Sequence, residues 1–168
     1  MCTNEDRINY LDHAATTPVR EDVLEKMLPY FTQKFGNPSS LYALAGEARY
    51  GIDEAREQVA EVLGGRTTEI VFTGGGSESD NTAIKGVAAA RALSSARSPS
   101  NGHIITTAIE HHAILHTAEA LQKQNNINLA IAPVTAEGRV ENFEEHITDD
   151  TALVSVMHAN NETGVIQP

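Results

Sequence analysis

Apolar residues in the first part of the chain recur with the spacing of amphipathic helices. A helix is predicted to begin near Glu21, and Pro29 removes one backbone hydrogen bond and is expected to bend its last turn. A second helix is predicted from about Leu41 to Gly64-Gly65, a pair that suits a left-handed cap. The two apolar faces consist of Val23, Leu24, Met27, Leu28 and Phe31, and of Ile52, Ala55, Val59, Val62 and Leu63.

After the second helix, short apolar runs typical of buried strands alternate with helical patterns. The predicted strands are 70–73, 103–107, 129–132 and 151–157, and the predicted helices are 77–93, 111–124 and 143–147. The first of these helices is expected to bury Ile84, Val87 and Ala88, and residues 94–102 are predicted to form an exposed loop. The alternation indicates an α/β fold with a mostly parallel sheet and flanking helices.

Composition restricts the classes of partner and compartment. The 168 residues are 40% hydrophobic, which suits one soluble domain with a buried core. Twelve Lys and Arg against 23 Asp and Glu give a formal net charge of −11, which argues against a nucleic-acid or anionic-membrane partner. The only cysteine, Cys2, allows no intrachain disulfide, and the polar N-terminal segment is not a secretory signal. No apolar run approaches the ~20 residues of a membrane span. A cytoplasmic location is therefore expected.

Three glycines, Gly74, Gly75 and Gly76, follow the predicted strand 70–73, and Ser77 is predicted to be the N-cap of the next helix. Such a turn directs backbone N–H groups and the positive end of a helix dipole toward an anion such as phosphate. A flexible turn with an ordinary cap remains the alternative. The segment lacks the third glycine of a dinucleotide fingerprint and the Gly-Lys-Ser/Thr of a Walker A loop, so any bound phosphate belongs to another kind of ligand.

Polar clusters follow three of the predicted strands. Because ligands bind outside the carboxyl ends of parallel strands, Ser77, His111 and Asn161 are expected near a common rim. The Asn160-Asn161 pair also suits a simple turn, since Asn tolerates left-handed geometry.

The histidines near His111 allow more than one interpretation. His112 and His116 have the i, i+4 spacing of a metal site, but the helix has no acidic partner in the HExxH arrangement, and paired histidines often face solvent. No metal site is therefore predicted. An imidazole at a strand end can instead stack on a planar cofactor or transfer protons. Structural roles are expected for His13, His103, His146 and His158.

Five motifs, in order along almost the whole chain, carry a resemblance to a known family. They are YLDHAATTP from Tyr10, FGNPSS from Phe35, EIVFTGGGSESDN from Glu69, IEHH from Ile109 and MHANNETG from Met157. Together they resemble the N-terminal part of NifS/IscS-type cysteine desulfurases, members of the class V, fold-type I pyridoxal-phosphate enzymes. The implied fold is part of the large domain of these transferases, without its later strands.

The resemblance implies roles for the matching residues. Gly75, Gly76 and Ser77 would hold the phosphate of pyridoxal 5'-phosphate through non-covalent contacts. His111 would stack on the cofactor ring and take part in proton transfer as the catalytic residue, and Asn161 would contact the ring hydroxyl and the substrate side. The family usually has Thr at the position of Ser77, and Ser keeps the hydroxyl. Ala15 and Thr16 would help to line the substrate pocket.

The resemblance also implies a division of the chain. Residues 1–18 would form an N-terminal arm on the side of the small domain, able to dock through Tyr10 and Leu11. Residues 19–168 would be the N-terminal portion of the cofactor-binding domain. In the family, the strand at 70–73 pairs with a strand from later in the sequence, so alone it would expose an unpaired edge.

Three groups that the family needs are absent from this sequence: the lysine that binds the cofactor covalently, the aspartate that pairs with its ring nitrogen, and the loop cysteine that accepts sulfur. The resemblance therefore implies an N-terminal half of a cysteine desulfurase, which converts L-cysteine to L-alanine and passes sulfur on as a persulfide for iron–sulfur cluster or thio-cofactor assembly. The chain alone is expected to be inactive.

The implied partners are a complementary C-terminal segment or chain, a homodimer or split-chain assembly, and a sulfur-acceptor protein. A non-catalytic fragment that binds the cofactor phosphate, or has a regulatory role, is the alternative.

Overall fold

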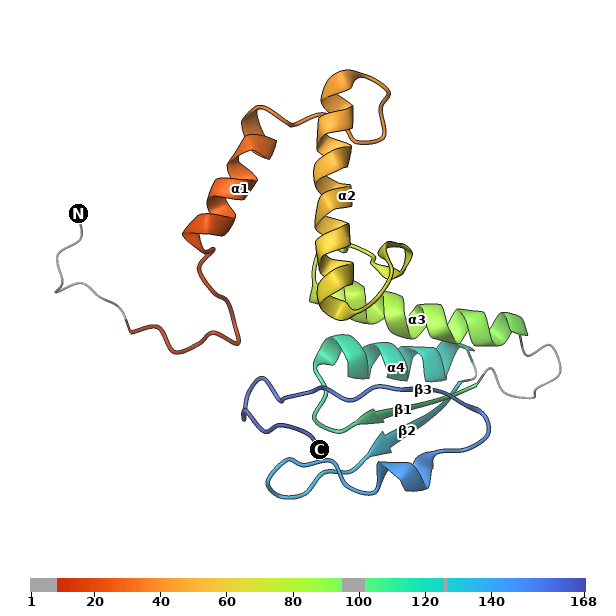
Figure 1. The fold of residues 1–168 in the computed structure, drawn as a ribbon. Helices are drawn as coiled ribbons and strands as arrows, with labels where there is room; N and C mark the ends of the chain where they lie inside the picture. Colours follow the sequence, from red (N-terminus) through yellow and green to blue (C-terminus); the bar gives the residue numbers. More distant parts are fainter. Residues whose placement is uncertain (1–8, 95–101, 126) are drawn as a thin grey trace. The chain divides into compact units, whose positions relative to one another are not determined.

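The computed structural model describes residues 9–94, 102–125 and 127–168 (Figure 1). The chain divides into two compact units, Met1–Phe72 and Thr73–Pro168. Most of the predicted loop 94–102 lies outside the described residues. The division into an arm of residues 1–18 and a domain portion of 19–168 stays a prediction, because the two compact units meet between Phe72 and Thr73.

The first unit contains two helices, α1 (Glu21–Thr32) and α2 (Ala43–Leu63), and a short 3₁₀ helix at Thr67–Glu69. Both helices were predicted from the apolar spacing, and Pro29 lies inside α1 as expected. A Cβ atom on Gly51 of α2 would lie 2.7 Å from Cε1 of Tyr30 in α1. The two helices therefore approach each other where α2 has no side chain.

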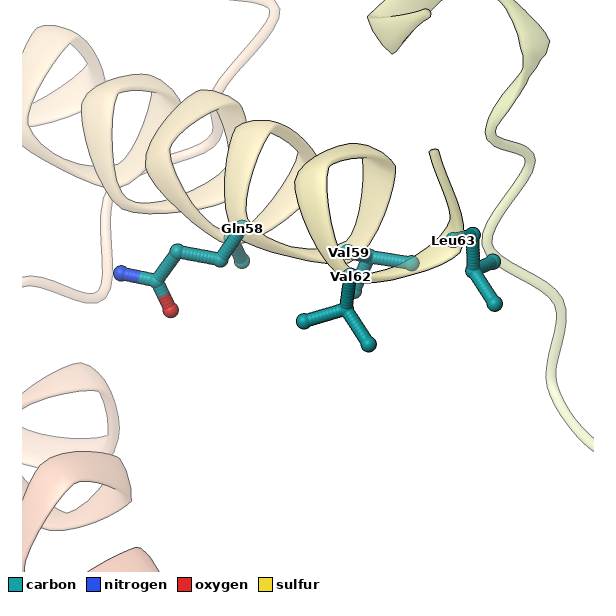
Figure 2. A pocket seen from close by; sticks show the side chains of 5 residues that line it. Gln58, Val59, Val62 and Leu63 are labelled. Atoms are coloured by element: carbon teal, nitrogen blue, oxygen red, sulfur yellow. The ribbon is translucent and has the colours of Figure 1, made fainter. Parts of the chain in front are cut away.

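The apolar faces of these helices remain largely open. No residue of α1 is buried, and the five side chains of its apolar face are 40–68% exposed. Tyr10 and Leu11, through which the arm was predicted to be able to dock, are 39% and 91% exposed, and docking stays a prediction. In α2, Val59, Val62 and Leu63 extend from one side and, with Ala55 and Gln58, line a shallow hollow of about 350 Å³ (Figure 2).

The C-terminal end of α2 has the predicted cap. Gly64 has φ 67°, and its N–H donates to the carbonyl oxygens of Ala60 and Glu61. The N–H of Gly65 also donates to the Ala60 carbonyl oxygen at 2.8 Å. Glycine adopts this left-handed geometry without steric cost, so the pair ends the helix where the apolar pattern ends.

The predicted strand at 70–73 does not form within the described residues. The segment is extended at Ile70, with φ −92° and ψ 125°, but it pairs with no other strand there. Its contacts come instead from Arg56, whose guanidinium donates to the Ile70 carbonyl and lies 4.8 Å from the Phe72 ring centroid. An apolar run predicts an extended backbone, but a strand also needs a hydrogen-bonding neighbour.

The second unit is built on a three-stranded parallel sheet in the order β2-β1-β3, which confirms the predicted α/β fold. β1 is His103–Thr107, β2 is Asn128–Ala132 and β3 is Thr151–Val154. All five residues of the central strand β1 are buried. β3 is shorter than the predicted 151–157 because its ladder with β1 ends at the pair Ile105 and Val154.

Helices α3 (Gly76–Ser94) and α4 (His112–Asn125) complete the second unit, with a 3₁₀ helix at Phe143–His146. In Figure 1, α4 lies against the sheet and α3 lies beside α4. Ile84 and Ala88 of α3 are buried as predicted, whereas Val87 is half-buried. The core cluster consists of Ile84, Ala88, Ile104, Ile114, Leu121 and Ile127.

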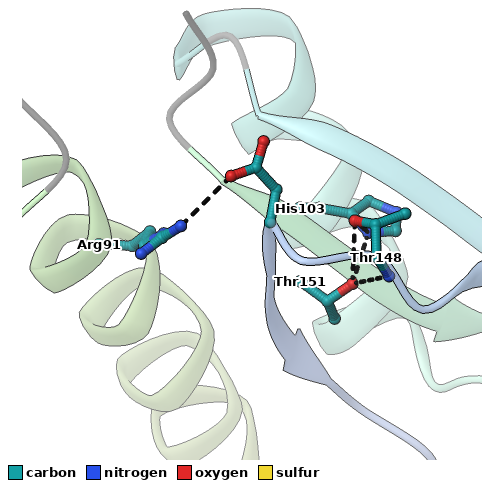
Figure 3. Close-up of polar contacts among 5 residues, drawn as sticks. Arg91, His103, Thr148 and Thr151 are labelled. Atoms are coloured by element: carbon teal, nitrogen blue, oxygen red, sulfur yellow. Dashed lines mark hydrogen bonds and ion pairs between the residues drawn. The ribbon is translucent and has the colours of Figure 1, made fainter. Parts of the chain in front are cut away.

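Polar side chains form hydrogen bonds at the amino ends of β1 and β3 (Figure 3). Nδ1 of His103 lies 2.9 Å from Oγ1 of Thr151, which also accepts the N–H of Thr148 at 2.8 Å. Arg91 of α3 forms an ion pair with Asp150 at 3.3 Å. Burial, and to a smaller extent His146, lowers the pKa of His103, whereas Asp150 opposes the shift. His103 therefore has a structural position, as predicted. No helix in the described ranges is long and apolar enough to cross a membrane.

Ile104→Ala is expected to lower the free energy of unfolding of the second unit by about 3 kcal/mol, since it removes methyl groups from a packed core. Ile104 is 2% exposed in β1, whereas Ile131 in β2 is 42% exposed. The same deletion at Ile131 is expected to cost less than about 1 kcal/mol. Urea denaturation of the full chain, followed by far-UV circular dichroism, measures both losses. Equal losses would contradict the assigned core.

Gly64→Ala is expected to destabilise α2 by about 1 kcal/mol, because a Cβ atom disfavours the positive φ of the cap. Gly46→Ala is the matched control inside the same helix, where an added Cβ meets no atom within 4 Å. It is expected to stabilise α2 by up to about 1 kcal/mol through helix propensity. Thermal melting by circular dichroism and amide exchange in α2 should give opposite signs for the two variants.

Candidate functional site

A pocket of about 280 Å³ opens beyond the carboxyl ends of β1 and β3. One wall is the segment that follows β1 and the other is the segment that follows β3. The structure brings His111 and Asn161 together in this pocket, as the parallel sheet predicted. Its lining consists of Ala108, Ile109, Glu110, His111, His112, Asn160, Asn161, Glu162 and Thr163.

His111 is held at the start of α4. The predicted helix 111–124 begins one residue later, and the His111 carbonyl oxygen accepts the N–H groups of Ile114 and Leu115 at 2.9 and 3.1 Å. Its Nδ1 accepts the N–H of Ala113 at 3.1 Å. A neutral imidazole that accepts at Nδ1 carries its proton on Nε2. The exposed ring can therefore present an N–H donor and a flat face to a ligand.

Asn160 and Asn161 have different surroundings. Oδ1 of Asn160 accepts the N–H groups of Glu162 and Thr163 at 3.0 and 2.9 Å, and Nδ2 donates to the Ile109 carbonyl at 3.1 Å. Asn160 thus makes the turn that the sequence allowed as an alternative. The Asn161 side chain is exposed and makes none of the hydrogen bonds found among the described residues. Asn161 therefore remains free to bind a ligand.

The glycine turn differs from the prediction in its cap. Helix α3 begins at Gly76, so Ser77 lies inside the first turn and is not the N-cap. Gly75 precedes the helix, and its carbonyl accepts the N–H groups of Glu78 and Ser79 at 3.1 Å each. The carboxylate of Glu78 caps the turn by accepting the Gly74 N–H at 2.7 Å. An acidic residue in the first turn of a helix is typical of a capping box, so Glu78 could have indicated this cap from the sequence.

The start of α3 fits a phosphate. The N–H groups of Gly75, Gly76 and Ser77 make none of the hydrogen bonds found among the described residues, as the first turn of a helix dictates. A Cβ atom added to Gly75 or Gly76 would meet no atom within 4 Å, so the turn is open on that side. Free N–H groups at a helix N-terminus are suited to an anion.

Ser77 does not line the pocket that contains His111, but a hydrogen-bond network connects the two helix starts. Nδ2 of Asn81 donates to the Ser77 carbonyl at 2.8 Å and to the Ala113 carbonyl at 3.4 Å. Thr117 of α4 donates its hydroxyl to Oδ1 of Asn81 at 2.9 Å. Sequence reasoning missed Asn81, because only packing shows that an amide at this position reaches both helices.

Glu110 was also missed by sequence reasoning. Its half-buried carboxylate accepts the N–H of Met157 at 2.6 Å and the hydroxyl of Thr107 at 3.4 Å. Burial raises the pKa of Glu110, the two hydrogen bonds oppose this shift, and the charge of Asp80 adds to it. The carboxylate is therefore costly to ionise where it lies.

The remaining candidates are the two predicted substrate-binding residues in the N-terminal arm and the histidine pair considered as a metal site. Ala15 and Thr16 belong to the first unit, in a turn where their N–H groups donate to the Asp12 carbonyl at 3.1 and 3.4 Å, and their role in substrate binding stays a prediction. The rings of His112 and His116 have centroids 4.9 Å apart. Within the described ranges, no group of three or more His, Cys, Asp or Glu side chains is placed to hold a metal ion.

The raised pKa of Glu110 predicts a pH dependence of stability. Between its unfolded and folded pKa values, the folded chain binds more protons than the unfolded chain, so the stability contribution of this group falls as pH rises. Wild type should thus lose stability relative to Glu110→Gln as pH rises from about 4 toward neutral. Urea denaturation of both chains across this range measures the difference, with Glu141→Gln as an exposed control. A difference that stays constant with pH would contradict the shift.

Comparison with known proteins places this architecture in a family. The family model for aminotransferase class-V matches residues 9–168. A cysteine desulfurase IscS from Clostridium botulinum is 50% identical over 161 residues, which cover 95% of this chain and 39% of the relative. The chain thus spans about 40% of the length of the curated relatives that it matches, and corresponds to their N-terminal part.

Solved structures give the same result. A NifS-like protein has a TM-score of 0.84 and 41% identity over 94% of this chain and 42% of its own. A structure described as SspA in complex with cysteine has a TM-score of 0.83 and 41% identity over 95% of this chain and 44% of its own. Residues 9–168, which the family model matches, contain the parallel sheet, the glycine turn and both walls of the pocket. The chain therefore belongs to the aminotransferase class-V family.

Proposed function

We propose that this chain provides part of the pyridoxal 5'-phosphate site of a cysteine desulfurase, and acts with a complementary segment that contributes the covalent lysine, the ring-nitrogen aspartate and the sulfur-accepting cysteine. The observation that carries the proposal is the shared pocket of His111 and Asn161 at the carboxyl ends of β1 and β3. The N–H groups at the start of α3, free among the described residues, support an anion site in the same unit.

Each residue would contribute a distinct interaction. Gly75, Gly76 and Ser77 would hold the phosphate with their N–H groups, and the helix dipole would add to the attraction. His111 would lie flat against the cofactor ring, its tautomer set by the Ala113 N–H on Nδ1, which leaves Nε2 to exchange a proton with substrate. Asn161 would donate its side-chain amide to the ring hydroxyl. Bound pyridoxal phosphate supplies an electron sink for bonds at the amino-acid Cα.

Cysteine as substrate rests on the relatives. The curated relatives include cysteine desulfurases, and one similar structure is described as a complex with cysteine. The proposed reaction yields alanine, and sulfur leaves as a persulfide on the cysteine of the complementary segment and then passes to an acceptor protein. A homodimer of the completed enzyme, or an assembly of split chains, is the proposed quaternary structure.

Reconstitution tests the proposal. The chain is mixed with the remaining C-terminal segment of the Clostridium botulinum relative and pyridoxal phosphate, and alanine and persulfide formation from L-cysteine are measured. Turnover is expected in the mixture and in neither part alone. His111→Ala should lower turnover at least 100-fold, because general acid–base catalysis contributes about 10²–10⁴-fold. His116→Ala is the control, since this exposed histidine lies outside the pocket lining.

Equilibrium dialysis of pyridoxal phosphate against the chain alone distinguishes the proposed function from that of a non-catalytic fragment. Retained binding without turnover in any mixture would favour a non-catalytic binding or regulatory fragment. Turnover in His111→Ala equal to that of wild type would contradict the role of His111, while the reconstitution itself would still stand.

A further inference from the structure

The two walls of the pocket lie beyond the ladder that joins their strands. Backbone pairing between β1 and β3 ends at Ile105 and Val154, and one further bond follows from the Ser155 N–H to the Ile105 carbonyl at 2.9 Å. The wall segments 108–111 and 157–163 therefore need other contacts to fix the distance between them.

Two side chains supply these contacts in opposite directions. Glu110, from the first wall, accepts the backbone N–H of Met157 in the second wall at 2.6 Å. Asn160, from the second wall, donates its side-chain amide to the backbone carbonyl of Ile109 in the first wall at 3.1 Å. Each wall thus holds the backbone of the other.

Glu110 and Asn160, together called the clamp, each precede one of the two pocket residues that are proposed to contact the cofactor. Glu110 precedes His111, and Asn160 precedes Asn161. Because consecutive Cα atoms are only about 3.8 Å apart, a shift at Glu110 or Asn160 moves His111 or Asn161 with it. The clamp therefore joins the two backbone segments from which His111 and Asn161 extend.

Burial of the Glu110 carboxylate costs stability at neutral pH, and the hydrogen bond to Met157 offsets part of this cost. The carboxylate is half-buried, and the charge of Asp80 opposes its ionisation. The contact thus joins two backbone segments at a place where the carboxylate is costly to ionise.

We propose that Glu110 is a positioning residue, which acts with Asn160 to set the spacing between His111 and Asn161 for the planar cofactor ring. This inference rests on the proposed function for the identity of the ligand. Glu110 acts through the backbone of Met157.

The first test uses amide exchange in the full chain without ligand. Glu110→Ala is expected to raise exchange at the Met157 N–H and in residues 160–163 at least tenfold, because the only hydrogen bond found for this N–H among the described residues is lost. Glu110→Gln keeps an oxygen acceptor and should stay within about threefold of wild type. Glu141→Ala removes an exposed carboxylate from the same unit and is the matched control. Unchanged protection in Glu110→Ala would overturn the clamp.

The second test measures the affinity of the same variants for pyridoxal phosphate by equilibrium dialysis. Glu110→Ala should weaken binding about tenfold, whereas Glu110→Gln should restore it to within about threefold of wild type. A weakening of equal size in both variants would assign the effect to charge and would overturn a positioning role. Wild-type affinity in Glu110→Ala would overturn it as well.

The two tests separate this inference from the proposed function. If wild type binds no pyridoxal phosphate, either alone or in the reconstituted enzyme, the proposed function fails and amide exchange alone decides the clamp. If wild type binds the cofactor and the Glu110 variants behave as wild type in both tests, the clamp fails and the proposed function stands.

Discussion

Strand β1 satisfies both of its hydrogen-bonding edges by lying between two parallel neighbours, and the second unit depends on this arrangement. Parallel neighbours require crossovers, so α4 must follow β1 and lie against the sheet before the chain returns as β2. The same constraint puts the carboxyl ends of β1 and β3 at one edge. His111 and Asn161, 50 positions apart in the sequence, meet there because their strands run in the same direction.

Local patterns predicted most elements, because they depend on periodicity within a segment. The bounds of β1 and the left-handed cap at Gly64 follow from residues close together in the sequence. The predictions that were wrong concern segments whose structure depends on contacts with residues far away in the sequence. The apolar run at 70–73 has no pairing neighbour in the described residues, and β3 stops where its ladder with β1 stops. Glu110 and Asn81 escaped notice because their contacts join residues more than 30 positions apart.

The candidate site divides its polar groups between two tasks. Asn160 uses its side-chain oxygen and nitrogen to hold the turn and the neighbouring wall, whereas Asn161 makes no hydrogen bond among the described residues. Likewise, Nδ1 of His111 accepts the Ala113 N–H while the side chain stays exposed. The neighbouring asparagines thus have different roles, since Asn160 holds the backbone and Asn161 is left to bind a ligand. The amino-acid composition does not distinguish these roles. The start of α3 follows the same rule, since Glu78 occupies the Gly74 N–H and leaves the next three N–H groups for a ligand.

The two units differ in the kind of side chain that they bury. Among the described residues, the buried hydrophobic side chains of the first unit are Ala45, Ala48 and Ala60, whereas the second unit buries isoleucines and a leucine. An alanine methyl group gives much less transfer free energy than a larger side chain. The units are therefore expected to open at different free energies, with the first unit as the less cooperative one. Denaturation of the chain would then show two transitions, and a single midpoint would not describe its stability.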